Sequence, residues 1–131
     1  MIYSLDTNIL VALLRSRDEI LSRKFLSKRP CDYCVSEIVR AELLFGVEKS
    51  DRPDENRHAV DQLLAPLRLI PFEGNTALHY AEIRTHLENA GSAIGSNDLL
   101  IAATARSHGH TLVTRNTSEF LRVPALAVEK W

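Results

Sequence analysis

The sequence predicts an α/β fold with a central, mainly parallel sheet that is covered by helices on both faces. Short apolar runs alternate with longer segments of helical periodicity, which is the pattern of strands joined by crossover helices. The chain has 131 residues, of which 45% are hydrophobic, and this size and composition predict one globular domain, residues 1–131. It contains no internal repeats, linkers or low-complexity tracts.

The N-terminal part of the chain predicts two strands and three helices. Residues 2–5 form a short apolar run that stops at an aspartate, and residues 33–35 form a second such run. Residues 9–14 and 19–26 have helical periodicity. Residues 36–49 predict a strongly amphipathic helix that begins at a serine, a residue that commonly caps helices.

The middle of the chain continues the alternation. A proline at its start favours a helix over residues 53–64, and residues 67–72 resemble a strand. Residues 75–90 are helical in pattern, and the glycine-bounded segment 91–95 interrupts them before a helix over residues 98–108. Each strand is thus followed by at least one helix.

The C-terminal part predicts a strand at residues 111–114, a helical turn at 118–121 and a last short strand at 127–129. In an open parallel sheet, functional residues collect at the carboxyl ends of the strands. Asp6 ends the first strand, and Asn116 follows the strand at 111–114. We therefore expect a functional site at this edge of the sheet.

The charge of the whole chain gives no strong attraction to nucleic acids or to anionic membranes. The 16 Lys and Arg residues against 17 Asp and Glu residues leave a formal net charge of -1, so any polyanion must bind to a local patch. A solvated helical face explains the basic residues near the N-terminus equally well. These residues are Arg15, Arg17, Arg23, Lys24, Lys28 and Arg29.

No segment predicts a membrane span or a leader. The apolar run at residues 9–14 is too short to cross a bilayer, and the N-terminus lacks a basic region and a small-residue cleavage site. We expect a cytoplasmic protein that does not bind membranes.

Cysteine and histidine do not predict a metal site. Cys31 and Cys34 have the spacing of a CxxC motif, but no second pair follows, and positions three apart on a strand point to opposite faces. The five histidines form no cluster of metal-ligand spacing. His108 lies where a helix end favours a cation, so its position needs no further explanation.

Three acidic residues at the expected edge each have an ordinary structural explanation. Asp6 and Asp98 stand at or near the first turn of a helix, where a carboxylate accepts hydrogen bonds from free backbone amides. Glu119 alone is an ordinary solvated residue. Considered separately, these residues do not require a functional role.

Glu42 is harder to explain in this way. Helical spacing places it on the same face as Ile38, Val39 and Phe45, and a carboxylate that faces the core needs a partner. A salt bridge to a buried arginine such as Arg84 is one possibility. A metal ion shared with the carboxylates at positions 6 and 98 is the other.

Four motifs in this order and spacing resemble those of the PIN-domain ribonucleases. They are "LDTNIL", "SEIVRAELLFGV", "GSNDLLIAATARSHG" and "LVTRNTSEF". With the total length, they are most similar to the VapC toxins of bacterial toxin–antitoxin pairs. The resemblance covers essentially the whole chain, including the short last strand and Trp131.

The resemblance implies a compact α/β/α domain with a Mg²⁺ or Mn²⁺ site that cleaves RNA endonucleolytically. Asp6, Glu42 and Asp98 match the three principal acidic positions of the family. A fourth acidic position is an asparagine here, Asn116, although Glu119 could supply the carboxylate. Mg²⁺ prefers hard oxygen ligands and keeps several waters, so such a set leaves room for a phosphate and an attacking water.

Other polar residues are candidates to orient the metal ligands or waters, although a cap or turn role fits Thr7 and Ser36 equally well. These candidates are Thr7, Asn8, Ser36 and Asn116. Possible RNA contacts come from the N-terminal basic residues Arg15, Arg17, Arg23 and Lys24.

The resemblance also implies partners. Structured RNA is the expected substrate, with tRNA as the leading candidate, and a cognate antitoxin is expected to cover the acidic cleft. The toxin is further expected to self-associate as a homodimer or to form a toxin–antitoxin hetero-oligomer.

Two other classes of function are weighed against this one. A haloacid-dehalogenase-like phosphatase also places an aspartate after its first strand, but it needs a second acid two positions later, where Asn8 stands. A non-catalytic dinucleotide-binding or partner-binding module is the other alternative, yet the chain has no GxGxxG or GKS/GKT loop.

Overall fold

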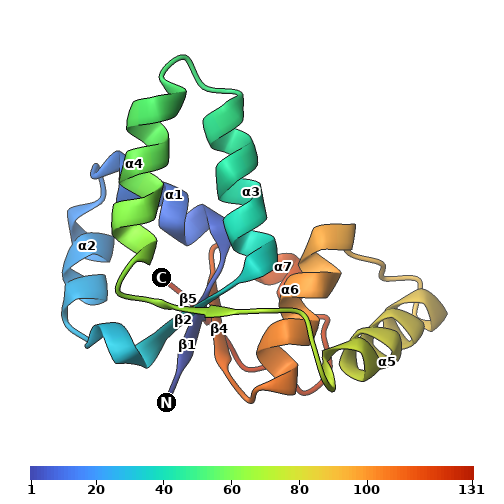
Figure 1. Cartoon of the computed structure of the whole chain (residues 1–131). Helices are drawn as coiled ribbons and strands as arrows, with labels where there is room; N and C mark the ends of the chain where they lie inside the picture. Colours follow the sequence, from blue (N-terminus) through green and yellow to red (C-terminus); the bar gives the residue numbers. More distant parts are fainter.

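The computed structural model describes all 131 residues and has a five-stranded parallel sheet at its centre (Figure 1). The strands are arranged in the order β3-β2-β1-β4-β5, and every neighbouring pair is parallel. Their bounds are β1 Tyr3–Leu5, β2 Tyr33–Ser36, β3 Arg68–Ile70, β4 Thr111–Thr114 and β5 Val128–Lys130. The predicted fold class is confirmed.

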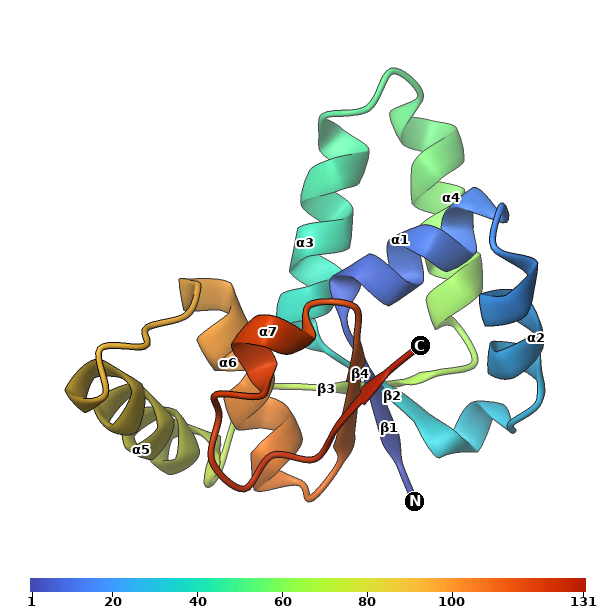
Figure 2. The ribbon, with the colours of Figure 1, turned by 180° about the vertical axis from the view of Figure 1, so that it is seen from behind.

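Seven helices surround the sheet. Figures 1 and 2 show α1, α2 and α4 on one side and α5 and α6 on the other, while α3 and α4 form an antiparallel pair that extends away from the sheet. Their bounds are α1 Thr7–Arg15, α2 Glu19–Leu26, α3 Glu37–Glu48, α4 Pro53–Leu64, α5 Thr76–Asn89, α6 Ser96–Ser107 and α7 Thr117–Phe120. None of these helices combines the length and the apolar character that crossing a bilayer requires.

Strand β1 lies in the middle of the sheet and fixes the register of its two neighbours. Tyr3 is paired with Tyr33 of β2 and with Thr111 of β4. The backbone N–H of Asp6 continues the ladder by donating to the carbonyl of Val113 at 3.0 Å. The ends of β1 and β4 are therefore side by side, at the edge where the sequence predicts a site.

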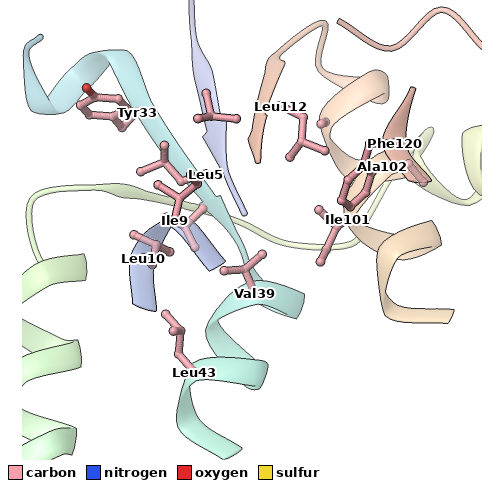
Figure 3. Packing of buried hydrophobic residues seen from close by; sticks show 14 of the residues in the cluster. Leu5, Ile9, Leu10, Tyr33, Val39, Leu43, Ile101, Ala102, Leu112 and Phe120 are labelled. Carbon is pink, nitrogen blue, oxygen red and sulfur yellow. The ribbon is translucent and has the colours of Figure 1, made fainter. Parts of the chain in front are cut away.

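Apolar side chains from both helical layers pack against this sheet. Figure 3 shows Leu5 of β1 between residues of α1 and α3 on one side, with Ile101 and Phe120 near Leu112 on the other. Leu5, Leu112 and Phe120 are fully buried. Burial of each such side chain stabilises the fold by about 1.5–3 kcal/mol, and it holds the strand ends in fixed positions.

Short polar side chains determine where the helices begin. Asp18 accepts a hydrogen bond from the N–H of Leu21 at 3.0 Å, and Ser36 accepts one from Val39 at 3.2 Å. Both are helix caps that satisfy otherwise free amides. The serine at the start of the predicted helix 36–49 thus has the capping role that its type favours.

The predicted elements all occur, with ends that differ by a few residues. The strand expected at 67–72 is shorter, and the helices expected at 9–14 and 98–108 begin two residues earlier. A 3₁₀ turn at Pro30–Asp32 was not expected. It carries Cys31, which is exposed, whereas Cys34 is buried in β2, and both are free thiols.

Cys34 is paired with a buried histidine at the other end of the sheet. Its Sγ atom lies 3.1 Å from Nδ1 of His110, and the ring of His108 stacks on that of His110 with 5.3 Å between centroids. Burial raises the pKa of the Cys34 thiol to about 11. Burial, together with the neighbouring His108, lowers the pKa of His110 from 6.5 to about 4. Both groups are therefore neutral at neutral pH.

This histidine makes the fold sensitive to acid. The pKa of His110 is lower in the folded than in the unfolded chain. The contribution of neutral His110 to the free energy of unfolding is therefore intact above pH 6.5, and it is lost as the pH falls toward 4. The free energy of unfolding should decrease over this range by up to about 3 kcal/mol more in the parent than in His110→Asn. Denaturant titrations at several pH values measure this, and His58→Asn, at an exposed position of α4, is the control. Equal pH slopes for the parent and His110→Asn would contradict the prediction.

Candidate functional site

A pocket of about 1090 Å³ opens at the carboxyl ends of β1 and β4. Its walls come from α1, the loop before α2, the middle of α3, the start of α6 and the residues after β4. Three of the sequence-predicted carboxylates line it: Asp6, Glu42 and Asp98. Residues that are 36 to 92 positions apart along the chain, counted from Asp6, therefore meet in one place.

Asp6 forms the floor of this pocket and is only 4% exposed. Its carboxylate accepts hydrogen bonds from Oγ1 of Thr114 at 2.6 Å and from the N–H of Thr7 at 2.8 Å. Nδ2 of Asn8 donates to it at 3.3 Å. Burial raises the pKa of Asp6, the two shorter hydrogen bonds oppose that shift, and the charge of Glu42 adds to it. The carboxylate is thus held in one orientation but lacks a cationic partner.

Glu42 approaches Asp6 from α3 through a shared neighbour. Oγ1 of Thr7 donates to Oε1 of Glu42 at 2.8 Å, while the backbone N–H of the same threonine binds Asp6. Thr7 therefore connects two of the three principal carboxylates, a position from which it could orient them.

The expected surroundings of Glu42 were partly wrong. The inner face of α3 is formed by Val39, Leu43 and Val47, each four residues from the next, whereas Phe45 is 64% exposed. Glu42 lies beside this stripe and is half-buried because α3 packs on α1 and α4 through the four-residue row. The core does not enclose it, and it faces the pocket instead.

The alternative partner for Glu42 is excluded. Nε of Arg84 donates to Glu88 at 2.9 Å, one turn along α5, and its Nη1 contacts Tyr80. This pair is exposed and belongs to the surface of a helix on the other side of the sheet. No buried salt bridge therefore explains the carboxylate on α3.

Asp98 and Glu119 form a hydrogen-bonded pair beside these residues. Burial raises the pKa of Asp98 to about 7, and the hydrogen bond with Glu119 and the negative charges of Asp6, Glu119 and Glu42 contribute to the shift. The same bond lowers the pKa of Glu119. The two carboxyl groups thus titrate as an interacting pair, in which Asp98 is the one whose pKa is raised.

Asn116 lies on the rim of the pocket and contacts this pair. Its Nδ2 donates to Oε2 of Glu119 at 3.2 Å, and its backbone N–H donates to Oγ1 of Thr114 at 2.9 Å. The departure from the acidic family pattern thus places an amide next to Glu119. Ser36 does not line the pocket, because its Oγ caps the buried first turn of α3.

The N-terminal basic residues do not form one patch. Arg15 and Arg17 line the acidic pocket. Arg23 lies 4.0 Å from Glu19 on α2, and Lys24 lies over the ring of Trp131 at 5.0 Å, so neither belongs to the pocket wall. Arg23 lies one helical turn from Glu19, which does line the pocket, but neither Arg23 nor Lys24 is part of the wall.

Sequence reasoning missed one basic residue, Arg115. It follows β4 directly and lines the pocket. The rule that located Asp6, namely that residues after a parallel strand face the site edge, applies equally to this arginine. The signal that could have located Arg115 is its position directly after the strand at residues 111–114.

The donor set of the pocket consists of oxygen atoms from carboxylates, one threonine and two asparagines. Hard divalent cations such as Mg²⁺ prefer such ligands, whereas softer metals prefer sulfur or imidazole. In the present conformation, no group of three or more His, Cys, Asp or Glu side chains could hold a metal ion. Burial is the main cause of the raised pKa values of Asp6 and Asp98, and the charges of neighbouring carboxylates add to both shifts.

Comparisons with known proteins agree on one family. The PIN domain model matches residues 3–126. The chain is 42% identical to ribonuclease VapC2 of Rickettsia felis over 132 residues, which cover 100% of this chain and 98% of the relative. It is 32% identical to the tRNA(fMet)-specific endonuclease VapC of Salmonella typhimurium over 129 residues, 98% of this chain and 97% of the relative.

Solved structures are similar over the same extent. VapBC2 from Rickettsia felis, bound to a DNA fragment from its promoter, contains a chain with a TM-score of 0.92 and 41% identity, and the match covers 100% of this chain and 99% of that one. DNA-bound VapBC from Salmonella typhimurium matches with a TM-score of 0.91 and 31% identity, over 100% and 98% of the two chains.

Uncompensated charge should make the metal-free protein less stable as the pH rises. The pKa of Asp98 is about 7 in the folded chain and near 3.8 in the unfolded chain. Ionised Asp98 therefore lowers the free energy of unfolding increasingly between these two pH values, and the loss is complete above pH 7. Without divalent ions, Asp98→Asn should melt a few degrees higher than the parent at pH 8 and equally at pH 4. Calorimetry in EDTA measures this.

The matched control is Asp51→Asn, which removes the same charge at an exposed position. It should melt like the parent at both pH values. If Asp98→Asn gained the same number of degrees at pH 4 as at pH 8, charge repulsion would not be the cause.

Proposed function

This chain belongs to the PIN-domain family, as a ribonuclease of the VapC group, and from that premise we propose that its acidic pocket binds a divalent metal ion and cleaves RNA endonucleolytically. One observation supports placing the proposed nuclease activity in this pocket. Carboxylates from the end of β1, the middle of α3 and the start of α6 line one cavity, and none of the three forms a salt bridge with the arginines of its wall.

We propose Asp6, Asp98, Glu42 and Glu119 as the residues that would hold Mg²⁺, or Mn²⁺ in its place. The all-oxygen donor set fits such an ion, and Glu119 can replace the acidic residue that is absent at Asn116. When bound, a cation of this kind supplies charge neutralisation for the phosphate and lowers the pKa of an attacking water.

The residues of the chain itself orient the reacting groups. Thr7 and Asn8 donate to the carboxylates of Glu42 and Asp6, which fixes the direction of their free oxygens. Without a metal ion, the pKa of Asp98 is raised to about 7, so this carboxyl group has to release its proton when it becomes a metal ligand.

The proposed substrate is structured RNA, and tRNA in particular. A relative that is 32% identical over nearly the whole chain acts on tRNA(fMet) by its name. Arg15 and Arg17 on the pocket wall would contact the phosphate backbone. These local charges are consistent with a chain whose net charge is only -1.

We also propose that a VapB-type antitoxin restrains this ribonuclease in the cytoplasm. Several similar structures are toxin–antitoxin complexes, which supports a protein partner of that kind. A homodimer or a toxin–antitoxin hetero-oligomer is the proposed assembly.

The nuclease proposal predicts the effect of single carboxylate changes. Asp6→Asn, Glu42→Gln and Asp98→Asn should each reduce the rate of RNA cleavage at least about a hundredfold, because each removes a charged ligand that its neutral replacement cannot match. Cleavage of labelled tRNA with and without Mg²⁺ measures this. Glu48→Gln, an exposed glutamate of the same helix as Glu42, is the matched control.

The same assay separates the nuclease from the phosphatase alternative. Asn8 donates an N–H to Asp6, and an amide cannot serve as the acid that a haloacid-dehalogenase-like phosphatase requires. A generic phosphate monoester should therefore remain intact under conditions in which RNA is cut. Hydrolysis of the monoester without cleavage of RNA would overturn the proposal.

The antitoxin proposal predicts a growth phenotype. Expression of the chain should arrest growth, and co-expression of its VapB-type partner should restore it and yield a complex that co-purifies. Asp98→Asn should bind the partner but leave growth unaffected. An arrest that persisted with Asp98→Asn would point to toxicity without RNA cleavage.

A further inference from the structure

Arg115 is attached to the acidic site through its backbone. Its N–H donates to Oδ1 of Asn8 at 3.2 Å, and Nδ2 of the same asparagine donates to Asp6 and to Thr114. Any shift of the chain after β4 would therefore also move the groups that orient Asp6. The position of this arginine is set by the site itself.

Two further bonds hold its guanidinium group. Nε donates to the carbonyl oxygen of Trp131 at 3.2 Å, and Nη2 is paired with Asp18. Nη1 donates no hydrogen bond within the protein, and the side chain remains 38% exposed. The guanidinium thus has one amino group free on the wall of the pocket.

Both anchors are themselves fixed. Asp18 caps α2 through its bond to Leu21. The ring of Trp131 lies 5.4 Å from the ring of Tyr3, and the ammonium groups of Lys24 and Lys28 lie 5.0 and 5.9 Å from its centroid. Cation–π contacts and aromatic packing of this kind restrict the indole. The carbonyl that receives Nε is therefore held in place.

The other two arginines of the pocket differ in this respect. Arg15 and Arg17 are exposed and form no side-chain hydrogen bond or salt bridge within the protein. A flexible cation loses rotamer freedom on binding a ligand, whereas an arginine that is already held loses less. Of the three arginines, Arg115 is the one whose guanidinium group is already held in one orientation before a ligand binds.

The chemistry of the pocket identifies that ligand as an RNA phosphate. Five carboxylates line the pocket against three arginines, so an incoming phosphate is repelled unless a guanidinium meets it. Arginine suits phosphate oxygens because its N–H groups form charge-assisted hydrogen bonds of fixed direction. Given the proposed function, on which this step rests, the phosphate belongs to the RNA strand that enters the site.

We propose that Arg115 binds a backbone phosphate of the RNA and places the strand against Asp6. In this arrangement Asp18 and Trp131 are positioning residues, which act on the RNA only through the guanidinium that they hold. The sequence motif "VTRNT" thus contributes a substrate contact as well as the amide at Asn116.

The first test compares variants of Arg115 in tRNA cleavage. Arg115→Ala should raise KM about tenfold, the value of one lost charge-assisted hydrogen bond, with a smaller effect on kcat. Arg115→Lys should lie between, because one ammonium cannot replace the three directed contacts. Arg57→Ala, an exposed arginine of α4 paired with Asp61, removes the same charge and should behave like the parent.

The second test measures binding without cleavage. In the Asp98→Asn background, the affinity for bulk tRNA should depend on salt, and Arg115→Ala should reduce the slope of log affinity against log salt by about 1.

The affinity for Mn²⁺, measured by calorimetry on the otherwise unmodified protein, should not change in Arg115→Ala. Trp131→Ala should raise KM in the same direction, and Trp131→Phe, which keeps an aromatic ring, should restore it.

The outcomes are distinguishable. If Arg115→Ala bound tRNA with the affinity and salt slope of Arg57→Ala, the arginine would be only a structural tie between β4, α2 and Trp131, and the proposal would be overturned. A parent that cleaves no RNA at any divalent metal ion would overturn the proposed function. The salt-dependent binding of tRNA would still decide the role of Arg115 in that case.

Discussion

The buried carboxylate of Asp6 is the constraint on which the rest of the site depends. A charge that is 4% exposed is tolerated only if its oxygens are satisfied. Thr114 of β4 and the first amide of α1 satisfy them here. Because one partner comes from the neighbouring strand, the hydrogen bond fixes the end of β4 relative to the end of β1. The other partner is the backbone N–H of Thr7, so the Asp6 carboxylate also caps the N-terminus of α1.

The remaining functional groups are attached to this arrangement through short polar links. Thr7 carries the connection to Glu42 on α3, and Asn8 carries it to Arg115 after β4. Neither link is strong by itself, since a typical hydrogen bond contributes about 1 kcal/mol to stability. Together they connect α1 with α3 and with the segment after β4. The precision of the site therefore comes from polar bonds, and its rigidity comes from the core beneath it.

The two ends of the sheet show opposite solutions to burying polar groups. At one end, burial keeps Cys34 and His110 neutral, and the two groups satisfy each other. At the other end, burial and the neighbouring carboxylates Glu119, Asp6 and Glu42 raise the pKa of Asp98 to about 7. The first arrangement suits a structural role. The second carries charge repulsion that lowers stability without a cation, as is common where a site is selected for function.

The sequence by itself determined the class of fold and pointed to three of the carboxylates that line the pocket. Alternating strand and helix patterns are local properties, and each predicted element occurs, because apolar periodicity decides which face of a segment is buried. The motif around Asp6 marks the end of a strand directly. The four motifs in order were sufficient to identify the family, whose model matches residues 3–126.

Only the tertiary structure decided which charged residues meet. Arg15 and Arg23 look equivalent in the sequence, yet Arg15 lines the pocket and Arg23 is paired with Glu19 outside its wall. The surroundings of Glu42 were misjudged because helix packing selected a stripe of every fourth residue, which left Phe45 outside. Arg115 gained its role from Asp18 and Trp131, which are far from it in the sequence. Such contacts depend on how the helices rotate and pack on the sheet, and that rotation is a collective property of the core that no local pattern encodes.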